Sequence, residues 1–188
     1  MPRRSSAELR SLRERVFREV FEAHFGRVVR YVERQTGHTG IAEDIASSVF
    51  EVAWRKLDPD NPFGLPWLIR TAMHKTRDYQ RREYRGAAAV TALARLAEES
   101  PQELDELERL ALNDALDKLQ PKDREIIRLT YWDGLSASEI GAVLRMREGA
   151  IWTRLHRART QLRDRLEETT TREVKSERRG AGKTSPTA

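Results

Sequence analysis

The sequence predicts an all-α protein with two small helical domains joined by a flexible linker. Apolar residues recur every three or four positions along most of the chain, which is the period of a helix. Only 10 Gly and 7 Pro occur in 188 residues, too few for the many turns of a β-sandwich or barrel. Hydrophobic residues make up 38% of the chain. That fraction suits small helical bundles and disfavours a large enzyme core.

The first predicted helix begins near Leu9 and ends near Gly37. Its apolar residues fall at helical spacing: Leu12, Val16, Phe17, Val20, Phe21, Phe25, Val28, Val29 and Val32. Because they line one side of a helix, we expect that side to face a core.

The second predicted helix covers residues 42–57 and carries two adjoining apolar stripes. One stripe holds Ile45, Val49, Val52 and Leu57, and the other holds Ala42, Ala46, Phe50 and Trp54. A three-helix domain needs only one such stripe, so part of this helix could be kept for a partner. A helix buried deeply in its own bundle would explain the pattern equally well.

Residues 58–64 are rich in Asp, Asn, Pro and Gly and therefore predict a loop. Leu65-Pro66 then begins a third helix, since proline at the first helical position costs no hydrogen bond. Basic side chains recur on one of its faces at spacings of four, three, four and four: Arg70, His74, Arg77, Arg81 and Arg85. A row of cations on one face favours contact with nucleic acid.

The first domain is expected over residues 1–85, followed by a linker over 86–100 that is rich in Ala and increasingly acidic. Ser100-Pro101-Gln102-Glu103 is a capping box, which predicts the start of a helix and of a second domain over 101–168. The basic tail 169–188 is expected to be disordered because Thr, Ser, Gly and Pro separate its charges.

The second domain contains the sharpest signal in the sequence. Ser136 and Glu139 form a capping box that opens a short helix through Leu144, and a break at Arg145-Met146 separates it from a longer helix. The longer helix turns four apolar residues inward: Ile151, Leu155, Ala158 and Leu162. This order predicts a helix-turn-helix, whose second helix enters the major groove of DNA.

The outward face of that second helix is strongly basic. Between residues 145 and 165 there are seven Arg against Glu148 and Asp164. The expected DNA-facing side chains are Arg147, Glu148, Trp152, Thr153, Arg154, His156, Arg157 and Arg159. Arg can contact guanine with two parallel hydrogen bonds, which suits a face that reads sequence.

The charge is also divided along the chain. Residues 1–85 carry a net charge of +5, residues 86–113 carry −4 and residues 114–188 carry +4. Two basic lobes flanking an acidic strip suit a protein that lays two surfaces on a polyanion, although an ordinary solvated helix surface remains an alternative.

Several classes of function find no support in the residues. The chain has no cysteine, so disulfides, zinc knuckles and thiolate catalysis are excluded. Its four His have no metal-ligand spacing, and no nucleophile-and-base pair or glycine-rich phosphate loop occurs. We therefore expect no metal, no cofactor and no enzyme activity. Because neither a secretory signal nor a membrane-spanning apolar run is found, we expect a soluble cytoplasmic protein.

Two groups of residues together resemble the extracytoplasmic-function (ECF) group of bacterial sigma factors. The part that is similar to sigma region 2 comprises Ala42-Glu43-Asp44-Ile45, Val49-Phe50, Ala53-Trp54-Arg55, Trp67-Leu68, Ala72, Asp78 and Arg81-Arg82. The part that is similar to region 4 comprises Leu119-Gln120-Pro121, Arg124, Gly134-Leu135-Ser136, Glu139-Ile140, Gly149-Ala150-Ile151, Arg154-Leu155 and Arg157-Ala158-Arg159. The chain departs from the family pattern at Ser47-Ser48, His74, Arg145 and Trp152.

The resemblance implies a promoter-specificity subunit that binds core RNA polymerase through the β′ clamp helices and the β flap and recognises promoter DNA. The polymerase-binding residues would be Asp44, Ser47, Ser48, Phe50 and Trp54. The −10 element would be captured and melted by Asp60, Asn61, Phe63, Trp67, Arg70, His74, Arg77 and Arg81. The −35 element would be read by Arg147, Glu148, Trp152, Thr153, Arg154, His156 and Arg157, with Ser136 at a phosphate. The resemblance further implies an anti-sigma factor as a partner, and no membrane insertion.

Two other functions compete with this interpretation. An autonomous helix-turn-helix regulator would use residues 1–85 for dimerisation or sensing, but it would not need a second cationic DNA face. An enzyme with an appended DNA-binding domain lacks a catalytic constellation. The resemblance to sigma factors therefore leads.

Overall fold

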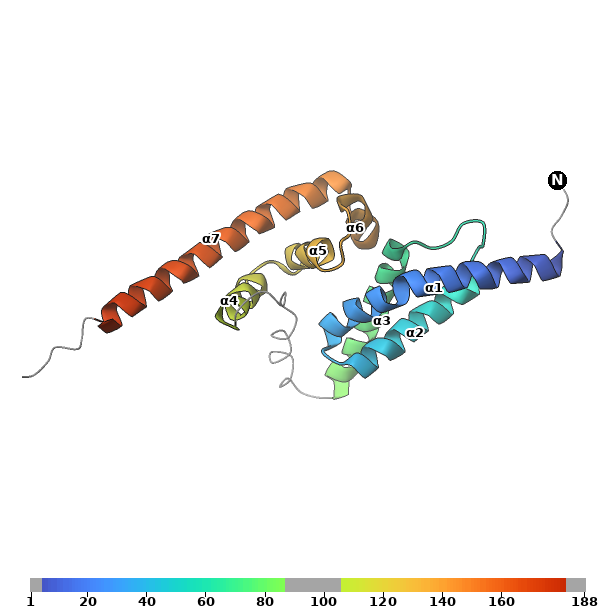
Figure 1. The fold of residues 1–188 in the computed structure, drawn as a ribbon, viewed down its shortest axis with the longest axis horizontal. Helices are drawn as coiled ribbons and strands as arrows, with labels where there is room; N and C mark the ends of the chain where they lie inside the picture. The colour runs from blue at the N-terminus through green and yellow to red at the C-terminus, as the bar shows by residue number, and fades with distance from the viewer. Residues whose placement is uncertain (1–4, 87–105, 182–188) are drawn as a thin grey trace, which may run out of the picture.

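The computed structural model describes residues 5–86 and 106–181, which form two groups of helices (Figure 1). The first group contains α1 (Ser6–Thr36), α2 (Thr39–Lys56) and α3 (Leu65–Gly86). The second contains α4 (Glu106–Asp117), α5 (Pro121–Tyr131), α6 (Ala137–Leu144) and α7 (Glu148–Ala181). The all-α prediction is confirmed.

The three helices of the first domain pack against one another in every pairing. Ser5 and Glu8 form a capping box that begins α1, and Gly37 ends it in the left-handed conformation at φ 66°. The predicted boundaries near Gly37 and Leu65 agree with the structure. The core of this domain contains both apolar stripes predicted on α2, apart from Trp54 and the half-buried Val52.

In the second domain, α7 packs against α4, α5 and α6. Ile126, Ile140 and Ile151 are fully buried where these helices meet, and Leu155 and Ala158 continue the buried side of α7. The inward face predicted for this helix is therefore confirmed except at Leu162, which is half-buried.

α7 continues past Thr169 to Ala181, over the first part of the tail for which the sequence analysis expects disorder. No Gly or Pro occurs between Ala150 and Arg179, so nothing in the backbone chemistry stops the helix at residue 169. The predicted linker 86–100 and the capping box at Ser100 fall almost wholly outside the described residues.

The two domains are in direct contact. α6 lies beside α3, and the buried apolar cluster is continuous from one domain to the other (Figure 1). The far part of α7 extends beyond the other described helices. Nothing in the sequence pattern predicted this packing, because residues that meet across domains have no fixed spacing.

Candidate nucleic-acid interfaces and an aromatic groove

A helix-turn-helix is formed by α6, the turn at residues 145–147 and the start of α7. Ser136 caps α6: its Oγ accepts a hydrogen bond from Glu139 N at 3.3 Å, and its backbone N donates to Glu139 Oε2 at 2.8 Å. The hydroxyl also donates to that carboxylate at 2.8 Å. Ser136 therefore fixes the start of α6, and a phosphate contact would involve the exposed end of this capped helix.

The turn depends on two backbone features. Arg145 ends α6 in the left-handed region at φ 55°, and Met146 N donates to Gly141 O at 2.9 Å. A Cβ on Gly141 would lie 2.7 Å from Met146 O, which is closer than real contacts allow. The close approach of helix and turn therefore requires glycine at residue 141, which the sequence analysis did not single out.

The residue before α7 and the first three turns of that helix present the residues predicted to read DNA. Arg147, Thr153, His156 and Arg157 are exposed, and the Trp152 side chain is 54% exposed. Glu148, also exposed, accepts a hydrogen bond from Trp152 Nε1 at 3.4 Å.

Arg154 and Arg159 are already engaged within the second domain. Arg154 Nη1 lies 2.6 Å from Asp123 Oδ1, a carboxylate that is buried in α5. Arg159 Nε donates to Tyr131 Oη at 2.6 Å, and its guanidinium lies 5.4 Å from the centre of that ring. These two arginines hold α7 on α5, so part of the predicted basic face has a structural role.

The second candidate DNA surface is formed by the loop before α3 and by one face of α3. Asp60 N donates to Asp58 Oδ1 at 3.0 Å, and Asn61 N donates to Asp58 O at 3.1 Å, which shapes the loop as a turn. Phe63 and Trp67 then stack, with ring centres 3.9 Å apart and planes 16° apart. Both rings are half-buried, so a partly accessible aromatic pair stands at the start of the helix.

The cationic row predicted on α3 is present over the described side chains. His74, Arg77 and Arg81 are exposed and Arg70 is half-buried, while the side chain of Arg85 lies outside the described part. Arg81 lies 3.9 Å from Asp78, a weak contact because both side chains are mostly solvated.

An apolar groove of about 800 Å³ runs along the junction of α1 and α2. It is lined by Glu14, Phe17, Arg18, Phe21, Glu22, Ser47, Phe50, Glu51 and Trp54. The rings of Phe17 and Trp54 meet edge to face at 5.0 Å, as do those of Phe21 and Phe50. Trp54 remains 37% exposed, whereas Phe50 is only 2% exposed and belongs to the core. This is an exposed apolar patch of the kind that binds a partner.

The predicted polymerase-binding residues are only partly brought together in this aromatic groove. Ser47, Phe50 and Trp54 line it, and exposed Asp44 lies one turn before Ser47 on the same face of α2. Ser48 instead accepts a hydrogen bond from Lys75 Nζ of α3 at 2.7 Å. The α1 side of the groove was missed, although Phe17 and Phe21 at a spacing of four were visible in the sequence.

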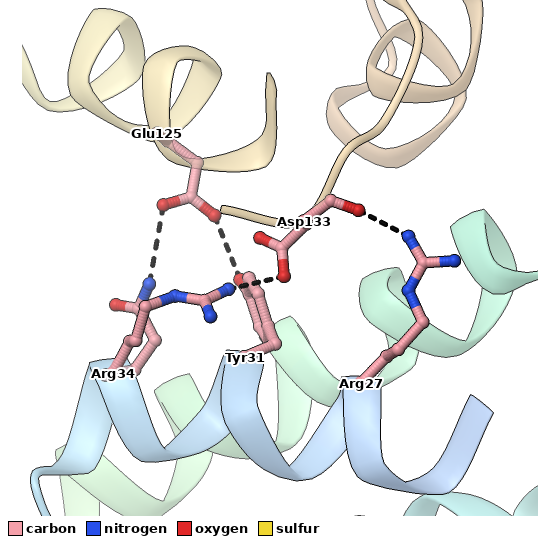
Figure 2. Close-up of polar contacts among 6 residues, drawn as sticks. Arg27, Tyr31, Arg34, Glu125 and Asp133 are labelled. Atoms are coloured by element: carbon pink, nitrogen blue, oxygen red, sulfur yellow. Dashed lines mark hydrogen bonds and ion pairs between the residues drawn. The ribbon is translucent and has the colours of Figure 1, made fainter. Parts of the chain in front are cut away.

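A third arrangement, the interdomain contact, joins α1 to the second domain (Figure 2). Tyr31 Oη donates to Glu125 Oε1 at 3.0 Å. Arg34 forms an ion pair with the Asp133 carboxylate, and Arg27 donates to the Asp133 carbonyl. The Arg34 and Asp133 side chains are only 9% and 4% exposed. The sequence analysis named none of these residues as functional.

Burial dominates the ionisation of the interdomain contact. It raises the pKa of Glu125, an effect that Tyr31, Arg128 and Arg34 oppose and Asp133 reinforces. It raises the pKa of Asp133 as well, against the pull of Arg34, Arg27 and Arg30. The pKa of Tyr31 lies well above its ordinary value because of burial and the neighbouring Glu125. The charged carboxylates therefore lose hydration that their partners only partly replace.

Neither a membrane span nor a metal centre is found within residues 5–86 and 106–181. No helix there is long and apolar enough to cross a membrane. No three His, Asp or Glu side chains there come together as metal ligands.

Comparison with protein families places a known domain on each half of the chain. Residues 20–86 match the family described as Sigma-70 region 2, and residues 109–162 match Sigma-70, region 4. The matches contain both candidate DNA surfaces, α2, most of α1 and the helix-turn-helix. An autonomous helix-turn-helix regulator would not require the first of these domains.

Relatives carry the same two halves over most of their length. RNA polymerase sigma factor CarQ of Myxococcus xanthus is 32% identical over 157 residues, which covers 81% of this chain and 90% of CarQ. ECF RNA polymerase sigma factor SigL of Mycobacterium tuberculosis is 30% identical over 159 residues, covering 81% and 90%. SigW of Bacillus subtilis, also an ECF sigma factor, is 29% identical over 166 residues, covering 80% and 88%.

Solved structures show the same fold. CnrH, solved in complex with the cytosolic domain of CnrY, matches with a TM-score of 0.57 and 27% identity over 85% of this chain and 97% of CnrH. The sigma factor RpoE from Bartonella quintana, solved with the anti-sigma factor NepR, matches with a TM-score of 0.59 and 20% identity, over 80% of this chain and 96% of RpoE. Since both sigma regions are present and CarQ and SigL are covered almost completely, the chain belongs to the ECF group of RNA polymerase sigma factors, subunits that act in transcription initiation.

Proposed function

We propose that this sigma factor directs core RNA polymerase to promoters by reading the −35 element with α7 and by capturing and opening the −10 element with α3 and its preceding loop. The observation that carries the proposal is the presence of two separate basic surfaces, one on α3 of the first domain and one at the start of α7 in the second. A protein that recognised one duplex site would need only one of them.

The upstream contact is made by the exposed start of α7. Arg147 and Arg157 supply cations for guanine or phosphate, and Trp152, Thr153 and His156 supply further contacts to base edges. Arg154 contributes by holding the helix on Asp123, since its charge is already paired in the free protein. The capped start of α6 offers backbone N–H groups to a phosphate.

The downstream contact combines stacking with charge. The stacked rings of Phe63 and Trp67 offer an aromatic surface to an unpaired base, and Asp60 and Asn61 lie in the loop beside them. Arg70, His74, Arg77 and Arg81 then follow the phosphates of the separated strand. Stacking of one base on an aromatic ring is worth about 1–3 kcal/mol, which offsets part of the cost of unstacking it.

The aromatic groove between α1 and α2 is the docking surface for the β′ clamp helices of core polymerase. Its apolar floor suits an amphipathic helix. Its rim carries three carboxylates, Glu14, Glu22 and Glu51, against Arg18, which favours basic residues on that helix. The second domain contacts the β flap. Bond formation belongs to the polymerase, so this subunit uses no cofactor and acts where the polymerase and the DNA are, in the cytoplasm.

An anti-sigma factor is a further proposed partner. RpoE was solved with the anti-sigma factor NepR, and CnrH with the cytosolic domain of CnrY. A protein covering the aromatic groove of this chain would compete with the polymerase for the same side chains.

The proposal predicts that opening of DNA can be separated from closed binding. Replacing Phe63 and Asn61 with Ala should impair strand opening more than duplex binding, because stacking acts on a base only after it leaves the helix. Permanganate footprinting measures the first and gel shift of the holoenzyme measures the second. An equal loss in both assays would contradict the melting role of this loop.

A further inference from the structure

Two exposed side chains at the start of α7 use their hydrogen-bond donors within the helix. Trp152 Nε1 donates to Glu148 Oε1 at 3.4 Å, and Thr153 Oγ1 donates to Gly149 O at 2.9 Å. The N–H is the only polar group of an indole, and the hydroxyl hydrogen is the only donor of a threonine side chain. These two side chains therefore present mainly apolar surface, namely the Trp152 ring and the Thr153 methyl group, which together form a tryptophan patch.

The core of the second domain does not depend on the Trp152 ring. The ring is 54% exposed, whereas the preceding residue, Ile151, is fully buried. Leu155 and Ala158 continue the buried side of the helix. Trp152 therefore belongs to the surface of α7, where a large aromatic side chain suits a contact with a partner.

The tryptophan patch lies among the side chains proposed to contact the −35 element. Arg147 stands just before the helix, and Arg157 follows Trp152 by five residues, a rise of about 7.5 Å. Both arginines are exposed. The Glu148 carboxylate beside the ring adds a negative charge, which opposes the approach of a phosphate. The patch is therefore better suited to base edges than to the DNA backbone.

One base presents an apolar group in the major groove. Thymine carries its C5-methyl group there, while guanine presents two acceptors and cytosine and adenine present donors. A ring whose N–H is already engaged does not donate to the guanine acceptors, and covering them with apolar surface costs their hydration. The tryptophan patch therefore favours thymine over guanine.

We propose that Trp152 and Thr153 select a thymine in the −35 element by packing on its C5-methyl group. This thymine lies within about two base pairs of the pair contacted by Arg157, because the rise of about 7.5 Å between the two side chains matches about two steps of 3.4 Å. Glu148 is a positioning residue, which holds the indole N–H away from the bases. The inference deepens the proposed function and rests on it, since it requires that α7 reads the −35 element.

The test uses a library of duplexes randomised across the −35 region. Holoenzyme assembled from core polymerase and the full chain selects the duplexes that it binds, and these are sequenced. Each thymine shared by the selected −35 sequences is then replaced by deoxyuridine, which lacks only the methyl group. At the thymine that contacts the tryptophan patch, this replacement should weaken binding in a competition assay by about fourfold, the effect of one buried methyl group.

Variants of the patch connect this loss to the ring. Trp152→Ala should reduce the fourfold loss to less than about twofold, whereas Trp152→Phe keeps an apolar ring without an N–H and should retain it. Glu148→Ala frees the indole N–H and should raise binding to guanine at this position relative to thymine. Arg163→Ala, an exposed change further along α7, is the matched control and should retain the fourfold loss. If circular dichroism shows Trp152→Ala to be unfolded, Trp152→Gln replaces it.

Each outcome decides the inference. A loss on deoxyuridine that Trp152→Phe retains and Trp152→Ala lacks supports it. Three results would overturn it and leave the proposed function standing: selected −35 sequences without a shared thymine, a wild-type protein indifferent to deoxyuridine, or a loss that does not follow the ring in these two variants. Selected duplexes with no shared upstream sequence would overturn both, because α7 would then read no base.

Discussion

At the residue scale, Trp54 is the exposed member of an otherwise buried aromatic cluster. Its ring packs on Phe17, and the Arg13 guanidinium lies 4.8 Å from its centre. Phe50 lies beneath and is almost fully buried, so its replacement would damage the core by about 3–5 kcal/mol and would not report on binding. Trp54 is therefore the better probe of the aromatic groove.

We expect Trp54→Ala to weaken binding to core polymerase by about 2 kcal/mol or more, the loss typical of a central interface aromatic. Binding would be measured by fluorescence titration of labelled protein with core enzyme. Glu83→Ala, an exposed change on α3 away from the groove, is the control and should bind normally. Normal binding by folded Trp54→Ala would exclude the groove as the docking site.

Single residues also show where sequence reasoning succeeds and where it stops. Ser136 and Glu139 were predicted to cap a helix and do so, because capping follows a fixed local spacing. Phe50 was predicted at a docking surface but lies in its floor, and Ser48 was predicted there but is bound to Lys75. The neighbours of these side chains come from other helices, and no local pattern identifies them.

At the scale of elements, the start of α7 is the part of the molecule that we propose reads DNA. Its buried side is fixed by Ile151 and Leu155, which turns Arg157 outward. Arg163 is also exposed but lies further along the same helix.

Arg157→Ala should lower the discrimination between the correct −35 element and one with a substituted base pair by about 1–3 kcal/mol. Competition between the two promoters in a transcription assay measures this difference. Arg163→Ala removes the same charge from α7 and should leave the discrimination intact. If Arg157→Ala discriminated as well as the wild type, this residue would not belong to the reading surface.

The contact between α1 and α5 predicts that the stability of the folded protein depends on pH. Burial raises the pKa of Glu125 above its ordinary value of 4.5, so the carboxyl in the folded chain binds a proton more tightly than an exposed carboxyl does. The contribution of protonated Glu125 to the stability of the folded state is fully present below pH 4.5. It is lost as the pH rises through the raised pKa of this carboxyl. The width of this pH range depends on the groups around Glu125, which are Tyr31, Arg128, Asp133 and Arg34.

Wild-type stability should therefore fall relative to that of Glu125→Gln as pH rises above 4.5, because the amide cannot ionise. Thermal unfolding of the two proteins over the same pH series measures the difference. A difference that stays constant with pH would show that Glu125 has the same pKa in the folded and unfolded chain. Asp133 remains in both proteins, so its own titration cancels to first order.

At the scale of the whole molecule, the order of the elements was predictable and their packing between domains was not. The period of the apolar residues, the loop at 58–64 and the turn before α7 gave the helices of both domains. The interdomain contact depends on Tyr31 and Arg34 meeting Glu125 and Asp133 over about 90–100 residues of separation. Such pairs leave no periodic trace in one sequence.

The basic surfaces, too, were predictable from the sequence in some respects and not in others. Their residue types and helical faces followed from the sequence, because a face is set by spacing along one helix. The engagement of Arg154 by Asp123 and of Arg159 by Tyr131 did not follow, since it depends on how α7 lies on α5. A charge count therefore overstates the cations available to DNA.

The central claim is that this chain gives core polymerase its choice of promoter. The most direct test is multi-round transcription of fragmented host DNA by purified core polymerase, with and without the protein, followed by mapping of RNA 5′ ends. We predict new starts that appear only with the protein and that share two upstream elements, centred near −35 and −10. An unchanged set of starts, with a protein that does not co-elute with core polymerase, would contradict the account.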